Sequence, residues 1–153
     1  MTRKTLTLRC FLWLLAGFFL VGTARAQTGT LYTPKPGTKE RKAIMDALRV
    51  PVQKDLMKKV IFKIDTLNVL GEWAFLRGVP LQPDDKPMNY RGTRYQEAQD
   101  EGAFDDSITA LLRKMKGKWT VVTFNIGATD VVWETWDKDY KAPRAVFRLP
   151  ESS

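Results

Sequence analysis

The chain has 153 residues, with 25 lysines and arginines, 17 acidic residues and no histidine, which gives a net charge of +8. A chain of this length can bury one hydrophobic core, so we expect a single domain. The lack of histidine excludes imidazole catalysis and histidine metal sites, and the single cysteine excludes an intrachain disulfide.

The first 26 residues have the pattern of a signal peptide. Arg3, Lys4 and Arg9 precede an uncharged apolar run from Cys10 to Gly22, and Ala24-Arg25-Ala26 supplies the small residues that a signal peptidase reads. The apolar run is too short to span a bilayer comfortably. We therefore expect cleavage after Ala26 and a periplasmic or secreted protein without a transmembrane segment.

Removal of residues 1–26 changes the composition of the chain. Four of the 25 basic residues and none of the 17 acidic ones lie there, which leaves 21 against 17 and a net charge of +4. Cys10 leaves as well, so the mature chain contains neither cysteine nor histidine. Its stability must come from a hydrophobic core, and we expect neither a metal ion nor a cofactor.

The mature chain is predicted to begin with a leader. Residues 27–37 (QTGTLYTPKPG) are rich in proline, glycine and threonine, which favours an extended and poorly ordered segment. The single domain then occupies residues 38–153.

An amphipathic helix is predicted from about Lys39 to Lys58. Thr38 is a good N-cap for it, and Pro51 removes one backbone hydrogen bond inside it, so we expect a kink or two abutting helices. The apolar face is formed at a spacing of four by Ile44, Leu48, Val52 and Leu56.

Two strands are predicted after the helix. From Val60 the apolar residues alternate, and the alternation changes parity near Thr66, which indicates a bulge or a strand covered on both faces. Gly71 turns the chain into a second strand, which a proline-rich loop over 78–88 follows. Residues 89–99 are interpreted as another strand.

A second hairpin and a closing helix complete the predicted domain. Residues 107–126 alternate on both sides of a turn at Gly117. Thr129 or Asp130 then caps a helix that runs to Tyr140. Residues 144–149 are interpreted as a short edge strand.

These elements predict an α+β fold. We expect a kinked N-terminal helix packed on a curved antiparallel sheet of about four to five strands, with a C-terminal helix. Three motifs, PGTKERKAIMDALR, LGEWAFLRG and LLRKMKGKWTVVTFNIGATDVVW, resemble a family of small exported bacterial proteins of uncharacterised function. The arrangement looks more loosely like cystatin-like and nuclear-transport-factor-like folds. The resemblance implies this architecture and brings no activity with it.

The closing helix carries the main candidate for a binding surface. Trp133, Trp136 and Tyr140 present more large rings than one helix face needs, and Arg144 follows them. Such rings suit carbohydrate and peptide contacts, because the ring stacks while its polar rim hydrogen-bonds. The alternative is that the rings pack on the sheet, with Trp136 the more buried of the two tryptophans.

Charged residues gather at three further places. The acidic run suits a hard cation but matches no EF-hand spacing, and a solvated loop is the simpler interpretation. The two basic groups suit anionic envelope polymers or lipid head groups, or keep strand edges apart, and no nucleic-acid motif accompanies them. The acids are Glu97, Asp100, Glu101, Asp105 and Asp106, with Asp84 and Asp85 in an earlier loop; the basic residues are Arg113, Lys114, Lys116 and Lys118, and Lys54, Lys58, Lys59 and Lys63.

Acid–base catalysis without histidine is the alternative function. Asp65, Glu72 or Asp130 would serve if it were buried beside Tyr95 or Arg94, where burial tunes a carboxyl group for proton transfer. No nucleophile elbow, phosphate loop or metal motif supports it. We therefore expect a non-enzymatic binding or accessory module of the envelope. Its partner is left open between a glycan, a peptide and a protein, with a nucleic acid not expected.

Overall fold

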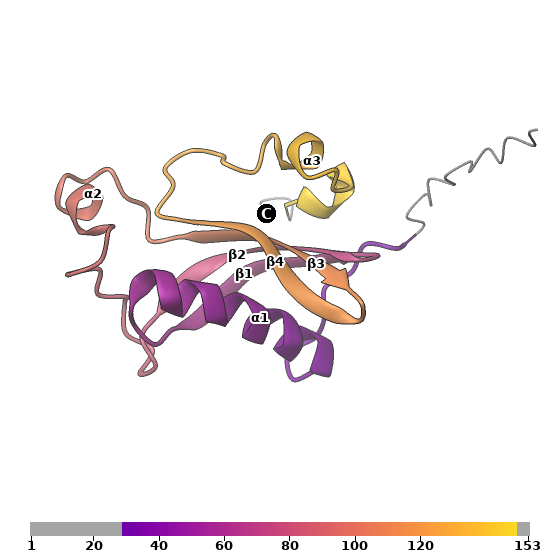
Figure 1. Cartoon of the computed structure of the whole chain (residues 1–153), viewed down its shortest axis with the longest axis horizontal. Helices are drawn as coiled ribbons and strands as arrows, with labels where there is room; N and C mark the ends of the chain where they lie inside the picture. The colour runs from indigo at the N-terminus through magenta and orange to yellow at the C-terminus, as the bar shows by residue number, and fades with distance from the viewer. Residues whose placement is uncertain (1–28, 150–153) are drawn as a thin grey trace, which may run out of the picture.

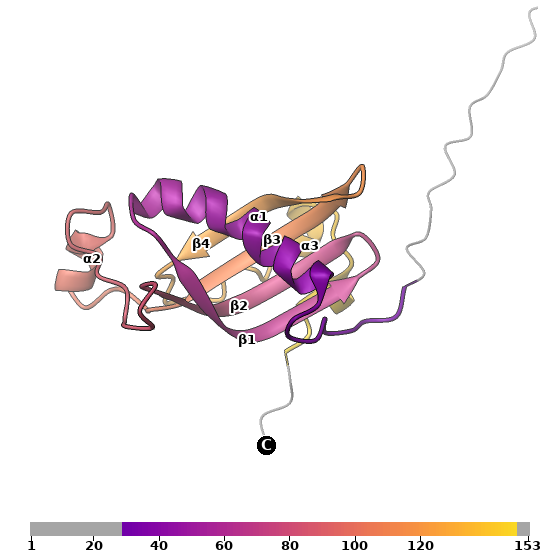
Figure 2. The ribbon, with the colours of Figure 1, turned by 90° about the horizontal axis from the view of Figure 1, so that it is seen from below.

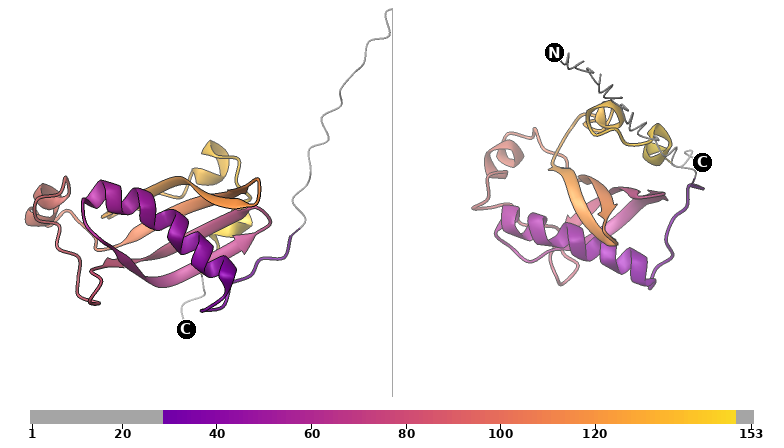
Figure 3. Two further views of the ribbon diagram at one scale, coloured as in Figure 1. Left: turned by 60° about the horizontal axis from the view of Figure 1, so that its bottom comes forward. Right: turned by 45° about the vertical axis from the view of Figure 1, so that its right-hand side comes forward.

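The computed structural model describes residues 29–149 and places a long helix on one face of a four-stranded antiparallel sheet (Figure 1). The predicted signal peptide and the first two residues of the leader lie outside the described residues. Short helical turns near the C-terminus cover part of the opposite face of the sheet (Figure 3). The predicted α+β class is confirmed.

Helix α1 (Lys39–Leu56) follows the predicted pattern closely. The side-chain oxygen of Thr38 accepts a hydrogen bond from the backbone N–H of Arg41 at 3.3 Å, and Met57 ends the helix in a left-handed conformation. The helix continues unbroken through Pro51, so the alternative of two abutting helices is wrong. The four predicted core residues of α1 are each 0 % exposed, namely Ile44, Leu48, Val52 and Leu56.

The sheet is a meander of four strands in the order β1-β2-β3-β4, with every neighbouring pair antiparallel. Figure 2 shows α1 lying across one face of this sheet. Both predicted hairpins are confirmed. The strands are β1 (Ile61–Leu70), β2 (Trp73–Leu81), β3 (Ile108–Met115) and β4 (Lys118–Ile126).

The predicted parity change in β1 is a β-bulge. The register shifts between Ile64 and Thr66, so Asp65 has no partner in β2. Because of this extra residue, Ile64 and Leu67 both point toward α1 and pack in the same cluster. The bulge thus keeps Phe62 and Ile64 on the same face of the sheet as Leu67 and Val69.

Two loop predictions are corrected by the structure. Residues 78–81 belong to β2 instead of the loop, and Pro80 is tolerated because it lies beyond the last β2–β3 pair, Gly78 with Ile108. The strand predicted over 89–99 is wrong: this region forms turns and the short helix α2 (Gln96–Asp100). The Thr93 N–H donates to the Tyr90 carbonyl at 3.0 Å, which closes a turn there.

The predicted C-terminal helix and edge strand are replaced by shorter elements. They are α3 (Trp136–Asp139) and the 3₁₀ turn η1 (Arg144–Phe147). Residues 129–135 contain threonine, aspartate, valine and tryptophan, which are weak helix formers, so packing on the sheet decides their conformation. Residues 144–149 do not form the expected edge strand. Asn68 of β1 hydrogen-bonds the carbonyls of Val146 and Arg148 through its side chain instead of its backbone.

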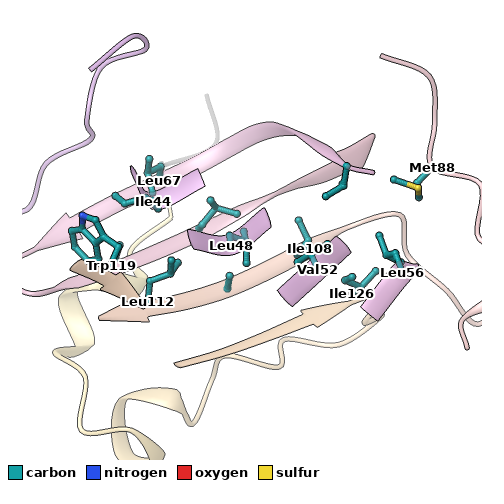
Figure 4. Close-up of a cluster of buried hydrophobic side chains, with 14 of the residues drawn as sticks. Ile44, Leu48, Val52, Leu56, Leu67, Met88, Ile108, Leu112, Trp119 and Ile126 are labelled. Carbon is teal, nitrogen blue, oxygen red and sulfur yellow. The ribbon is translucent and has the colours of Figure 1, made fainter. Parts of the chain in front are cut away.

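Two hydrophobic clusters lie on opposite faces of the sheet. The larger one joins α1 to the sheet and is shown in Figure 4. The smaller one joins the sheet to the C-terminal segment and contains Leu70, Trp73, Phe75, Leu111, Trp136, Ala142, Val146 and Phe147. The sheet is therefore buried on one whole face and on part of the other.

The leader residues within the described region lie beside β1. Tyr32 pairs with Val69 through two backbone hydrogen bonds of 3.0 and 2.7 Å. The Tyr32 hydroxyl also donates to a carboxylate oxygen of Glu40 at 2.7 Å. Over residues 29–149, no helix combines the length and the apolar character needed to cross a membrane.

Candidate functional site

The four residues of the predicted aromatic surface separate into two pairs. Trp136 is 6 % exposed and belongs to the smaller hydrophobic cluster, which agrees with the packing alternative for this ring. Tyr140 lies at its edge, with the two ring centroids 6.2 Å apart. Trp133 and Arg144 instead line an open groove on the surface. The separation follows from the loss of the predicted helix, because the three rings no longer share one helical face.

The groove beside η1 is the best-formed candidate for a binding site. It has a volume of about 460 Å³ and is partly open to solvent. Val131, Trp133, Glu134, Arg144, Ala145, Phe147 and Arg148 line it. Phe147 and Arg148 are not predicted to lie together, because successive residues of a strand point to opposite faces. Glu134 is not predicted as a site residue, because the prediction places it in the closing helix.

The aromatic floor of the groove is held in place by β2. The ring of Phe75, which is fully buried, lies 5.8 Å from the ring of Trp133 and 5.1 Å from the ring of Phe147. Trp133 comes from the segment before α3 and Phe147 from η1, so one strand residue positions both rings. Such tilted and edge-to-face contacts stabilise ring pairs beyond the area that they bury.

The charged rim of the groove contains both donors and acceptors. The Arg144 guanidinium donates to the carbonyl of Glu134 at 2.7 Å and lies 3.3 Å from a carboxylate oxygen of Asp137. Arg148 makes no ion pair within the described part of the chain. The groove thus offers one fixed guanidinium, one guanidinium available to a ligand and the carboxylate of Glu134.

The acidic residues do not form a cation site. Among residues 29–149, no group of three or more acidic side chains is placed to hold a metal ion. Asp84 pairs with Lys86 at 2.7 Å, and this contact lowers the pKa of the Asp84 carboxyl group. Glu97, Asp100 and Glu101 line a shallow hollow beside Arg94.

The three carboxylates proposed for acid–base catalysis lie on the surface. Asp65, Glu72 and Asp130 are exposed, and none of them contacts Tyr95 or Arg94. The structure brings a different acid to these two residues, one that no spacing in the sequence indicates.

That acid is Asp55, near the end of α1. One of its carboxylate oxygens accepts from the Tyr95 hydroxyl, and Arg94 donates to the same oxygen and lies beside the other, at 3.0 Å in each case. Burial and then the hydrogen bond to Asp55 raise the pKa of Tyr95 to about 12. A phenol with this pKa keeps its proton at neutral pH, so the cluster fastens residues 94–95 to α1.

One residue of each basic group contacts a part of the chain that is distant in sequence. Lys58 donates to the carbonyls of Asn89 and Arg91, the latter at 2.7 Å. Lys114 pairs with Glu40 at 3.4 Å, which joins β3 to the start of α1. Lys58 and Lys114 therefore connect separate elements of the fold.

Comparison of the chain with protein-family models, with curated proteins and with solved structures found no match. The resemblance to a family of small exported proteins stays a prediction from the motifs alone. The candidate function must therefore rest on the geometry of the groove.

Proposed function

We propose that the protein is an exported, non-enzymatic binding module of the bacterial envelope and that the groove beside η1 holds a glycan. The observation that carries this proposal is the half-buried ring of Trp133, set in an open groove between Glu134, Arg144 and Arg148. The signal-peptide pattern of residues 1–26 supports the location.

The chemistry of the groove fits a sugar polymer. A sugar ring packs its C–H face on an aromatic ring, while its hydroxyl groups both donate and accept hydrogen bonds around the rim. Glu134 supplies an acceptor there, and Arg148 supplies donors that no described residue occupies. We choose a glycan over a peptide because the groove offers an aromatic wall with side-chain donors and acceptors at its rim.

Co-sedimentation of the purified protein with isolated cell walls that retain their acidic polysaccharides tests this proposal. We expect wild type to bind and Trp133→Ala to lose at least about tenfold in affinity, since stacked aromatic anchors are common binding hot spots. Tyr140→Ala is the matched control, because Tyr140 is 36 % exposed in the same segment but does not line the groove. Equal binding by wild type and Trp133→Ala, or no binding at all, contradicts the proposal.

The alternative function is a small enzyme that uses Asp55 and Tyr95. Their direct hydrogen bond and the nearby Arg94 favour it. We place it second because Asp55 already accepts from two protein donors, and the hollow beside Arg94 is lined by neither Asp55 nor Tyr95. A ligand found to contact both Asp55 and Tyr95 would reverse this order.

A further inference from the structure

A row of polar side chains crosses the sheet beside the groove. Thr66 of β1 lies opposite Arg77 of β2, Arg77 lies opposite Thr109 of β3, and Thr109 lies opposite Asn125 of β4. Residues directly opposite in neighbouring strands point to the same face. Arg77 alternates in step with Trp73 and Phe75, so the row faces the C-terminal segment.

The polar row lies next to the part of the sheet that the C-terminal segment covers. The next row along the strands contains Asn68, Phe75 and Leu111, which the C-terminal segment packs against. In Figure 1 the linker from β4 to α3 passes over the same face of the sheet. The four polar residues therefore lie at the border between the smaller hydrophobic cluster and the uncovered part of the sheet.

Arg77 lacks the counter-charge that the structure gives to comparable arginines. Its guanidinium lies 4.6 Å from the centre of the Trp133 ring, and its Nε is buried without a hydrogen-bond acceptor. Within residues 29–149, no carboxylate lies in ion-pair distance of Arg77. Arg113 of β3 lies over Trp73 in a similar way, at 5.0 Å, but has Glu72 at 3.7 Å.

The far end of the row lacks a donor. The side-chain oxygen of Asn125 is buried without a hydrogen-bond partner, and buried polar atoms without partners are uncommon in folded proteins. Between the two ends, Thr66 and Thr109 are 7 % and 4 % exposed. Arg77 and Asn125 stand two strands apart, which corresponds to about 10 Å between their backbones.

We propose that this row binds a carboxylate-bearing sugar unit, a uronic acid, of the glycan held in the groove; the inference rests on the proposed function. One guanidinium without a counter-charge matches a single negative charge, and its planar fork matches a planar carboxylate. Trp133 connects the two surfaces, because its ring lines the groove and also lies beside Arg77.

A carboxylate fits this row better than a phosphate monoester. A phosphate monoester carries close to two negative charges at neutral pH, and the row contains one cation. The other three members, Thr66, Thr109 and Asn125, are neutral. The second charge would therefore be left unpaired in a partly buried place, which is costly.

Calorimetric titration with trigalacturonate and with its fully methyl-esterified form tests the inference, because the two probes differ in the charge of their carboxyl groups. We expect the acid to bind at least about tenfold more tightly than the ester. Arg77→Met should abolish this preference by lowering the affinity for the acid to that for the ester. Arg113→Met is the matched control, since it removes a guanidinium that lies over a tryptophan but already has an acidic partner.

A structural role of Arg77 alone would lower the affinity for both probes equally, and that result overturns the inference. Equal binding of acid and ester by wild type, or binding of neither, also overturns it. The binding of cell walls and its loss in Trp133→Ala are measured separately, so the glycan proposal can survive the failure of the acidic-sugar inference. If circular dichroism shows that Arg77→Met does not fold, Arg77→Gln replaces it, since it also removes the charge, and an undiminished preference for the acid in that variant overturns the inference.

Discussion

The side-chain amide of Asn68 donates a hydrogen bond of 2.9 Å to the backbone carbonyl of Val146. The same nitrogen donates to the carbonyl of Arg148 at 2.6 Å, and Asn68 is 8 % exposed. One buried side chain of β1 thus satisfies two carbonyls at the end of η1. Because η1 supplies Phe147 and its flanking arginines to the groove, Asn68 fixes the shape of the groove without lining it.

Asn68→Ala should therefore destabilise both the fold and the binding surface. We expect the free energy of unfolding to fall by about 2–3 kcal/mol, because a buried carbonyl and a partly buried one lose their donor. Limited proteolysis should then cut near residues 141–149 before it cuts elsewhere. Urea unfolding followed by circular dichroism gives the energy, and Asn125→Ala is the control, since its side-chain oxygen has no partner to lose. Equal losses in the two variants would contradict the role of Asn68.

Trp136→Ala should cost about 3–5 kcal/mol of unfolding free energy, as expected for a large ring removed from a core. Trp136 is 6 % exposed and packs among the residues of the smaller cluster. The cost for Tyr140→Ala, measured in the same urea unfolding experiment, should be much smaller, since that ring is 36 % exposed. A loss below about 1 kcal/mol for Trp136→Ala would mean that the C-terminal segment does not pack on the sheet as described.

The elements that the sequence predicts well are those with local patterns. The spacing of Ile44, Leu48, Val52 and Leu56 is a property of one helix, and the parity change near Thr66 is a property of one strand. Pro80 and the residues around it have the composition of a loop. The sequence does not show that β2 extends beyond the end of its pairing with β3. Where the decisive contact is local, the prediction holds.

The candidate site depends on contacts that no local pattern contains. Trp133 and Arg144 are identified from the sequence, but their groove exists because Asn68 and Phe75 hold the C-terminal segment against the sheet. Arg77 also depends on such contacts. In the sequence it is an ordinary strand residue, and only its cross-strand neighbours distinguish it. Some residues of the site can therefore be identified from the sequence, and the others only from the contacts and the register of the sheet.

Gly78→Ala should be far more damaging than an alanine at a turn glycine. A Cβ at Gly78 would lie 2.2 Å from the carbonyl oxygen of Lys63 and 3.1 Å from the Cα of Ile64, so the backbone of β1 would have to move away at its bulge. We expect a loss of at least about 3 kcal/mol or a failure to fold.

Gly117→Ala is the control for this experiment. Gly117 has a φ of +80° but open space around it, so alanine there adds only backbone strain, about 1–2 kcal/mol. Both energies come from urea unfolding of the purified variants. A Gly78→Ala variant no less stable than Gly117→Ala would show that β1 and β2 approach less closely than the register requires.

Tyr95 should make the stability of the protein fall at alkaline pH. Its pKa is raised to about 12 in the folded state, against about 10 in an unfolded chain. Between these values the folded state keeps a proton that the unfolded state loses, so the free energy of unfolding decreases as the pH rises from about 10 to about 12. Below about pH 10 the stabilisation is complete.

Tyr95→Phe removes this titration together with the hydrogen bond to Asp55. We expect a loss of about 1–2 kcal/mol at pH 7, because Asp55 loses one of its donors, and a shallower decline of stability above about pH 10. A slope remains, since burial and Glu40 raise the pKa of Tyr32 to about 12 as well. Urea unfolding of wild type and Tyr95→Phe at a series of pH values gives both quantities. If the two proteins show the same slope above about pH 10, then Tyr95 is not enclosed against Asp55, and the hydroxyl is free for the enzymatic alternative.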